Sequence, residues 1–289
     1  MSGFRTVVIT KSAKLDYQMG FMVVRSTEIQ KIYIGELSTL IIESTAVSLT
    51  AYLLAELVAH KVKVVFCDAK RNPISELIPC YGSHDSSIKI RDQIAWTAEA
   101  RTSAWTRIVM EKIRNQATVL HKYEKKEENF LLAYLGQVEL DDATNREGHA
   151  AKVYFNALFG KSFSRGDDSS INAALNYGYT VLLSCFNREI AACGYLTQLG
   201  LSHSNRFNPF NLGSDLMEPF RPVVDDRVLR LKPETFEKDE KQYMLEMLDE
   251  ELTINSRKER LTNAIAIYVK SVFALLNNKG EGTICFFEL

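Results

Sequence analysis

The stretch Cys80-Tyr-Gly-Ser-His-Asp-Ser-Ser-Ile-Lys-Ile90 separates two parts of the 289-residue chain that have different hydrophobic patterns. It contains one glycine and three serines and has no clear period, which predicts a linker. Before it, short runs rich in β-branched residues, such as Val62-Lys-Val-Val-Phe66, predict strands. After it, apolar residues recur at spacings of three and four between residues 90 and 113, which predicts helices. The fold class is therefore α+β, with a small N-terminal β-rich domain over residues 1–82 and a larger all-helical domain over residues 83–289.

Both domains contain a local pattern that refines this picture. Residues 48–60 form helices readily, carry their apolar residues on one stripe, and lie between the predicted strands 39–43 and 62–66. This arrangement predicts a strand–helix–strand unit. Near the C-terminus, a helix is predicted over Arg257–Asn277, and the apolar segment Thr283-Ile-Cys-Phe-Phe287 is expected to dock as a strand or as an apolar peg.

The composition excludes several classes of protein. A hydrophobic fraction of 46% is ordinary for a protein with a real core, and a formal net charge of -1 means that any nucleic-acid surface must be local. The N-terminus is polar and there is no apolar run of 18 residues, so we expect a cytoplasmic protein that does not cross a membrane. The five cysteines form no C-x-x-C pair, which predicts reduced thiols and neither a disulfide framework nor a zinc site.

Three stretches in the helical part carry residues suited to chemistry. In the first, Asn145 is a candidate N-cap, and Glu147 begins a stripe that should otherwise pack inward. In the second, His203 follows Gly200-Leu-Ser in a loop rich in serine and asparagine. In the third, Asp215 and Glu218 are three residues apart, on one helical face.

Each of these residues also has a plainer interpretation. Glu147 is suited to complement a helix dipole, His203 to be a satisfied surface residue, and Glu218 to form a surface ion pair with Arg221. Taken together, an imidazole and two carboxylates are a suitable ligand set for Mg²⁺ or Mn²⁺ near phosphate oxygens. Candidate phosphate-binding neighbours are Lys161, Arg165, Arg188, Asn205 and Arg206.

Four segments of the helical part closely resemble the CRISPR-associated integrase of spacer acquisition. They are Glu147-Gly-His-Ala-Ala-Lys-Val-Tyr-Phe, Asn172-Ala-Ala-Leu-Asn-Tyr-Gly-Tyr-Thr-Val-Leu, Gly200-Leu-Ser-His203 and Ser214-Asp-Leu-Met-Glu218-Pro-Phe-Arg-Pro. The N-terminal Arg5-Thr-Val-Val-Ile-Thr-Lys-Ser-Ala-Lys-Leu, Glu43-Ser-Thr-Ala-Val-Ser-Leu and Phe66-Cys-Asp resemble the type II branch of that family. The resemblance covers nearly the whole chain and keeps the order of the motifs.

The resemblance implies an N-terminal β-rich dimerisation domain, a helical catalytic domain and a homodimer. It implies a metal-dependent DNA integrase that joins the 3′-OH ends of short captured double-stranded DNA fragments to the CRISPR repeat, with associated endonuclease activity. It also implies a small ferredoxin-like CRISPR-associated partner protein, with which the integrase forms a heterohexamer. The implied ligands of Mg²⁺ or Mn²⁺, and the implied catalytic residues, are Glu147, His203 and Glu218.

The chain departs from the family pattern at one point. Many branches carry two aspartates about ten positions after the histidine, whereas here Asp215 and Glu218 lie 12 and 15 positions after His203. We therefore assign the ligand role to Glu218 and leave Asp215 as a residue that supports the ligands or caps a helix. Two other functions stay open at this point, namely a non-catalytic DNA-binding scaffold and a metallohydrolase that acts on small phosphates.

Overall fold

The computed structural model describes residues 5–69, 73–80 and 86–289, and the chain forms two compact units, residues 1–82 and 83–289. Residues 81–85 of the predicted linker lie outside the described residues. The first unit is rich in strands and the second is mainly helical, so the predicted mixture of α and β structure and its order along the chain are confirmed.

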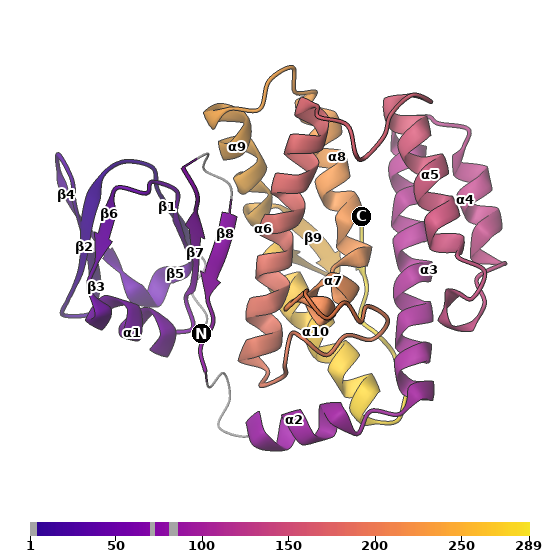
Figure 1. Ribbon diagram of the computed structural model, residues 1–289, viewed down its shortest axis with the longest axis horizontal. Helices are drawn as coiled ribbons and strands as arrows, with labels where there is room; N and C mark the ends of the chain where they lie inside the picture. Colours follow the sequence, from indigo (N-terminus) through magenta and orange to yellow (C-terminus); the bar gives the residue numbers. More distant parts are fainter. Residues whose placement is uncertain (1–4, 70–72, 81–85) are drawn as a thin grey trace. The chain divides into compact units, whose positions relative to one another are not determined.

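The N-terminal unit is built on two four-stranded sheets (Figure 1). One has the strand order β1-β5-β7-β8, in which β1, β5 and β7 are parallel and β8 is antiparallel to β7. The other has the order β4-β3-β2-β6, in which β6 is parallel to β2 and the other pairs are antiparallel. The bounds are β1 Arg5–Ile9, β2 Ala13–Gln18, β3 Phe21–Arg25, β4 Ile29–Tyr33, a 3₁₀ turn η1 Ile34–Glu36, β5 Leu37–Ile42, β6 Val47–Leu49, α1 Ala51–Ala59, β7 Lys63–Cys67 and β8 Pro73–Leu77.

The predicted strand–helix–strand unit is present in this part of the chain. Strands β5 and β7 are parallel neighbours, and α1 lies between them in the sequence. The Thr50 hydroxyl caps α1 by accepting a hydrogen bond from the N–H of Leu53 at 3.2 Å. Leu53 and Leu57 are fully buried in the same core as Leu40 and Val64, so the predicted stripe of α1 faces the strands.

Two long helices organise the C-terminal unit (Figure 1). Helix α6 packs against α7, α8, α9 and α10, while α3 packs against α4, α5 and the 3₁₀ turn η3. The bounds are α2 Ser86–Ile94, α3 Ala98–Lys122, α4 Glu128–Leu135, η2 Leu140–Asp142, α5 Arg146–Phe159, α6 Ser170–Ala192, α7 Asn211–Leu216, η3 Glu218–Phe220, α8 Arg221–Leu231, α9 Lys238–Leu245, η4 Glu246–Asp249 and α10 Leu261–Asn277. None of the helices within the described ranges combines the length and the apolar character needed to cross a membrane.

The prediction that this unit is all-helical is wrong, because it contains a three-stranded antiparallel sheet. Strands β9 (Glu251–Ile254) and β10 (Arg257–Arg260) form a hairpin, and β11 (Phe287–Glu288) pairs with the other edge of β9. The hairpin turns at Asn255 and Ser256, which have φ values of 51° and 60°, a conformation that asparagine tolerates better than most residues. The C-terminal helix therefore begins at Leu261 instead of Arg257, while the expectation that the apolar tail docks as a strand is confirmed. All five cysteines are within the described ranges and are free thiols.

Candidate functional site

Glu147 lies in the first turn of α5, where capping side chains satisfy the backbone. Asn145 is in the left-handed conformation, and its Oδ1 accepts a hydrogen bond from the N–H of Gly148 at 3.2 Å, so the predicted N-cap is confirmed. The Asp142 carboxylate accepts from the N–H of Arg146 at 2.8 Å and from that of Glu147 at 3.0 Å. These N–H groups have no partner inside the helix, so the caps hold the start of α5, and Glu147 with it, in place.

The carboxylates of Glu147 and Glu218 meet at one ammonium group, that of Lys112 on α3. Lys112 Nζ donates to Glu147 Oε1 at 2.5 Å and also to Glu218 Oε2. Arg221 Nε donates to the other oxygen of Glu218, Oε1, at 2.7 Å. The predicted ion pair between Glu218 and Arg221 is therefore present, but it does not lie on the surface, because Glu218 is only 3% exposed. Two carboxylates from segments far apart in the sequence thus share one buried positive charge.

The electrostatics of this cluster keep Glu218 and Lys112 charged. Burial alone would raise the pKa of Glu218, but the Arg221 guanidinium and the Lys112 ammonium outweigh burial and lower it to about 2. Burial would lower the pKa of Lys112, but the negative charges of Glu218 and Glu147 raise it. The stable state is therefore an ammonium between two carboxylates.

His203 is held by Asp215, which is fully buried. Asp215 accepts hydrogen bonds from the backbone N–H groups of Leu201 at 2.6 Å, Ser202 at 3.1 Å and His203 at 3.2 Å. It also accepts from His203 Nδ1, and because a carboxylate only accepts, Nδ1 carries the proton. The ring nitrogen Nε2 is then the one suited to bind a ligand. Asp215 therefore orients His203, and because it lies inside α7 it does not cap that helix.

The chain conformation before His203 depends on a glycine. A Cβ atom on Gly200 would lie 2.4 Å from the carbonyl oxygen of His203 and 2.7 Å from Asp215 Oδ2. The hydrogen bond from His203 to Asp215 raises the pKa of the imidazole; burial opposes this, and the negative charges of Asp215, Glu218 and Glu147 add to it. His203 thus lies in the electrostatic field of both glutamates.

The donor types fit a hard divalent cation. Glu147 and Glu218 offer carboxylate oxygens that already balance a positive charge, and His203 offers an imidazole nitrogen. In the part of the chain that the structure describes, no three His, Cys, Asp or Glu side chains converge closely enough to hold a metal ion. The charge and the chemistry of the site fit Mg²⁺ or Mn²⁺, but the position between the carboxylates is taken by the Lys112 ammonium.

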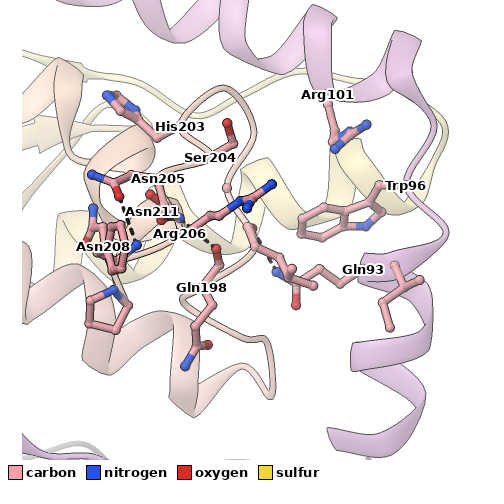
Figure 2. A pocket seen from close by; sticks show the side chains of 15 residues that line it. Gln93, Trp96, Arg101, Gln198, His203, Ser204, Asn205, Arg206, Asn208 and Asn211 are labelled. Atoms are coloured by element: carbon pink, nitrogen blue, oxygen red, sulfur yellow. Dashed lines mark hydrogen bonds between the residues drawn. The ribbon is translucent and has the colours of Figure 1, made fainter.

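A cavity of about 850 Å³ opens beside His203. Figure 2 shows Trp96 and Arg101 on one side of it and the loop that carries His203, Asn205 and Arg206 on the other. The two guanidinium groups can contact phosphates of a nucleic acid strand, whereas the Trp96 ring is only 7% exposed and packs against Tyr195 and Phe273. Two of the five predicted DNA-binding residues, Asn205 and Arg206, therefore lie with His203 at one cavity.

The other three predicted DNA-binding residues lie elsewhere. Arg165 lines a second cavity, of about 210 Å³, together with Glu218, and its guanidinium lies 5.5 Å from the ring centre of Tyr179. Lys161 is exposed after the end of α5. Arg188 pairs with Glu189, its neighbour in the sequence. Lys161 and Arg188 line neither cavity.

Comparison with known proteins decides the family. The sequence profile of the family described as CRISPR associated protein Cas1 matches residues 6–259. The chain belongs to the Cas1 family. A CRISPR-associated endonuclease Cas1 from Neisseria meningitidis serogroup C is 32% identical over 284 residues, covering 96% of this chain and 93% of the relative. This nearly full-length match agrees with the type II branch expected from the N-terminal segments.

Solved structures support the Cas1 fold. A casposase bound to integration product has a TM-score of 0.79 at 18% identity, covering 96% of this chain and 92% of the casposase chain. A chain of a Cas6-RT-Cas1–Cas2 complex has a TM-score of 0.72 at 17% identity, covering 96% of this chain and 35% of the longer one. At these identities the likeness concerns the fold.

Sequence reasoning on this Cas1-family chain missed Lys112 and Asp225. Asp225 is fully buried on α8, and the Tyr179 hydroxyl donates to its Oδ1. A signal for Lys112 was present, because it follows Ile108 by four positions and so occupies the buried stripe of α3. A charged residue in such a stripe needs a partner of opposite charge, and that partner is the pair of glutamates.

Proposed function

We propose that this Cas1-family protein is a metal-dependent DNA integrase of CRISPR adaptation, which joins the 3′-OH ends of short captured DNA fragments to the CRISPR repeat and also cuts DNA. The observation that carries the proposal is the convergence of Glu147 and Glu218 on one buried cation, within the electrostatic influence of an oriented His203. Carboxylates and an imidazole drawn from three separate segments are the donors that Mg²⁺ and Mn²⁺ accept near phosphate oxygens.

The chain's own residues have distinct tasks in this proposal. Glu147 and Glu218 supply carboxylate oxygens, and His203 supplies the lone pair of Nε2. Asp215 keeps the proton on Nδ1 and fixes the ring orientation. When bound, Mg²⁺ or Mn²⁺ supplies a Lewis acid that lowers the pKa of the attacking hydroxyl and stabilises charge on the scissile phosphate.

The proposed reaction exchanges one phosphodiester for another. The 3′-OH of the fragment gives up its proton as its oxygen bonds to a phosphorus atom of the repeat, and the bond between that phosphorus and the 3′ oxygen of the preceding nucleotide breaks. The departing oxygen takes up a proton and becomes a new 3′-OH, so the number of phosphodiesters is unchanged and no nucleotide cofactor is consumed. In the endonuclease reaction, water takes the place of the attacking 3′-OH. The protein's main work is alignment and charge stabilisation.

The cavity beside His203 is the proposed path of the reacting DNA strand. Arg101 and Arg206 have the charge to contact phosphates, while the exposed Asn205 has an amide group that can contact bases. A neighbour with the same fold, the casposase, is bound to an integration product. Because the chain has a net charge near zero, its affinity for DNA depends on such local cations and should fall steeply with salt.

We further propose the assembly and the location of the protein. The N-terminal unit is the proposed dimerisation domain of a homodimer, and a small ferredoxin-like partner protein completes a heterohexamer. Support comes from the neighbour that is part of a complex with Cas2. A cytoplasmic location suits the reduced cysteines.

The test uses the purified protein and a fluorescent branched DNA that mimics a half-integrated fragment. Release of the branch is followed with Mn²⁺, with EDTA, and for Glu147→Ala and His203→Ala. His121→Ala is the matched control, because His121 is exposed and pairs with Glu128 on the neighbouring helix α4. We expect metal-dependent release that is lost in both site variants and kept in the control.

The opposite results have clear meanings. Release that does not depend on metal, or that survives both Glu147→Ala and His203→Ala, would refute the proposed site. DNA binding by wild type and variants alike, without any release, would favour the alternative of a non-catalytic scaffold.

A further inference from the structure

The Lys112 ammonium occupies the place that the proposed metal ion requires. It is hydrogen-bonded to one oxygen of Glu147 and to one oxygen of Glu218, and its side chain is 9% exposed. Two positive charges cannot share this position, because their repulsion in a buried site would be large. A divalent ion can therefore bind between the glutamates only if the ammonium leaves.

The structure contains a second position with acceptors for this ammonium. Lys112 also lines the smaller cavity of about 210 Å³, together with Gln116 and Asp225. Gln116 Oε1 and Asp225 Oδ2 are both buried, and neither accepts a hydrogen bond from the residues that the structure describes. The Tyr154 hydroxyl is near enough to Asp225 to influence its pKa, but within the described ranges it too has no partner at hydrogen-bond geometry.

Unsatisfied buried acceptors are costly, so two of them at one cavity need an explanation. Gln116 follows Lys112 by four positions on α3, and therefore lies one helical turn away on the same face. Asp225 Oδ1 is bonded by Tyr179, which leaves Oδ2 for another donor. An ammonium with three N–H groups matches this pair of acceptors.

We propose that Lys112 moves between two positions, and that this exchange sets the affinity of the site for its metal ion. Without metal, Lys112 neutralises Glu147 and Glu218. With metal bound, its ammonium turns to Gln116 Oε1 and Asp225 Oδ2, which keeps it buried and paired. The inference rests on the proposed metal site and adds a positioning residue to it.

Two opposite effects on metal affinity follow. Removing the ammonium with Lys112→Met removes the competitor, so Mn²⁺ should bind about tenfold tighter or more. Removing the charge of the second position with Asp225→Asn leaves the displaced ammonium poorly paired, so Mn²⁺ should bind about threefold more weakly or worse. In a Lys112→Met background, Asp225→Asn should weaken Mn²⁺ binding less than it does in wild type, because there is no ammonium to receive and only the direct attraction between Asp225 and Mn²⁺ is lost.

The experiment is calorimetric titration of the full-length protein with Mn²⁺ at one pH. The proteins are wild type, Lys112→Met, Lys112→Gln, Asp225→Asn, the double variant and Glu147→Ala. Lys122→Met is the matched control, because Lys122 is on the same helix but pairs with Asp226. Thermal unfolding gives a second readout. In EDTA, Lys112→Met should have a lower Tm than wild type. Mn²⁺ without EDTA should then raise the Tm of Lys112→Met by more than it raises the Tm of wild type.

Each outcome decides one question. Tighter binding by both Lys112 variants, weaker binding by Asp225→Asn and a smaller effect of Asp225→Asn in the Lys112→Met background than in wild type support the exchange. If wild type binds Mn²⁺ and Glu147→Ala does not, but the Lys112 variants bind as wild type or more weakly, the exchange is overturned and the metal site stands. If wild type does not bind Mn²⁺, the proposed metal site is refuted, and the exchange with it.

Discussion

Asp225→Asn should stabilise the metal-free protein, and should do so more at higher pH. Burial raises the pKa of Asp225 to about 6, although the hydrogen bond from Tyr179, the nearby Tyr154 hydroxyl and the charges of Arg221 and Lys112 lower it. The folded protein therefore holds this proton more tightly than the unfolded chain, in which the ordinary value of 3.8 applies. The group contributes its full stability below pH 3.8, and that contribution is lost as the pH rises through about 6.

The size of the effect follows from the two pKa values. A tenfold difference in proton affinity is worth about 1.4 kcal/mol, so the change from 3.8 to about 6 corresponds to about 3 kcal/mol above pH 6. At pH 5 the carboxyl group is mostly ionised in the unfolded chain but still mostly protonated in the folded protein. About half of the stabilisation by this proton has therefore been lost at pH 5. Asparagine does not titrate. The free energy of unfolding of Asp225→Asn minus that of wild type should therefore grow by about 1 kcal/mol between pH 5 and pH 8.

The assay is urea unfolding of both proteins in EDTA at several pH values and constant ionic strength. Other titrating groups are common to both proteins, so they cancel in the difference. Asp226→Asn is the control on α8, because it removes the negative charge that pairs with Lys122 and Arg230, and should destabilise the protein. A difference between Asp225→Asn and wild type that stays constant from pH 5 to pH 8, or that falls, would show that burial of a charge is not the dominant effect.

Three other predictions concern the loop and its cavity. Asp215→Asn should lower the pKa of His203 toward its ordinary value, which NMR titration of the imidazole measures; an unchanged pKa would mean that Asp215 does not control the ring. Gly200→Ala should cost about 1–3 kcal/mol in urea unfolding, since its Cβ would clash with two oxygens, and wild-type stability would contradict the described loop. Arg206→Ala should weaken binding to DNA with a 3′ single strand and reduce the salt dependence by about one ion; anisotropy titrations at several salt concentrations, with an unchanged slope, would exclude a phosphate contact.

Local signals in the sequence were sufficient for several features of this protein. Asn145 was recognised as an N-cap because its side chain satisfies the first turn of a helix from within three residues. The apolar tail was expected to dock, and Phe287 is indeed buried. The division into a β-rich and a helical part followed from the change of hydrophobic period, which depends only on neighbouring residues.

Features that depend on distant segments could not be predicted in this way. Lys112 is 35 residues from Glu147 and 106 from Glu218, and no local pattern states that the three will meet.

The β9–β10 hairpin was missed for a different reason. Its alternation of buried Leu252 and Ile254 with more exposed neighbours covers only four residues, and the many charged residues around it hide so short a period.

The short strand β11 gives the end of the chain an influence on Glu218. The ring of Phe287 lies with its centre 4.3 Å from that of Phe220, which shares the 3₁₀ turn η3 with Glu218. Phe220 also packs against Phe186 of α6 and Tyr268 of α10. An affinity tag fused after residue 289 would start two residues from this aromatic cluster, so it could disturb a carboxylate that it never touches. Purification tags for functional work therefore belong at the other terminus.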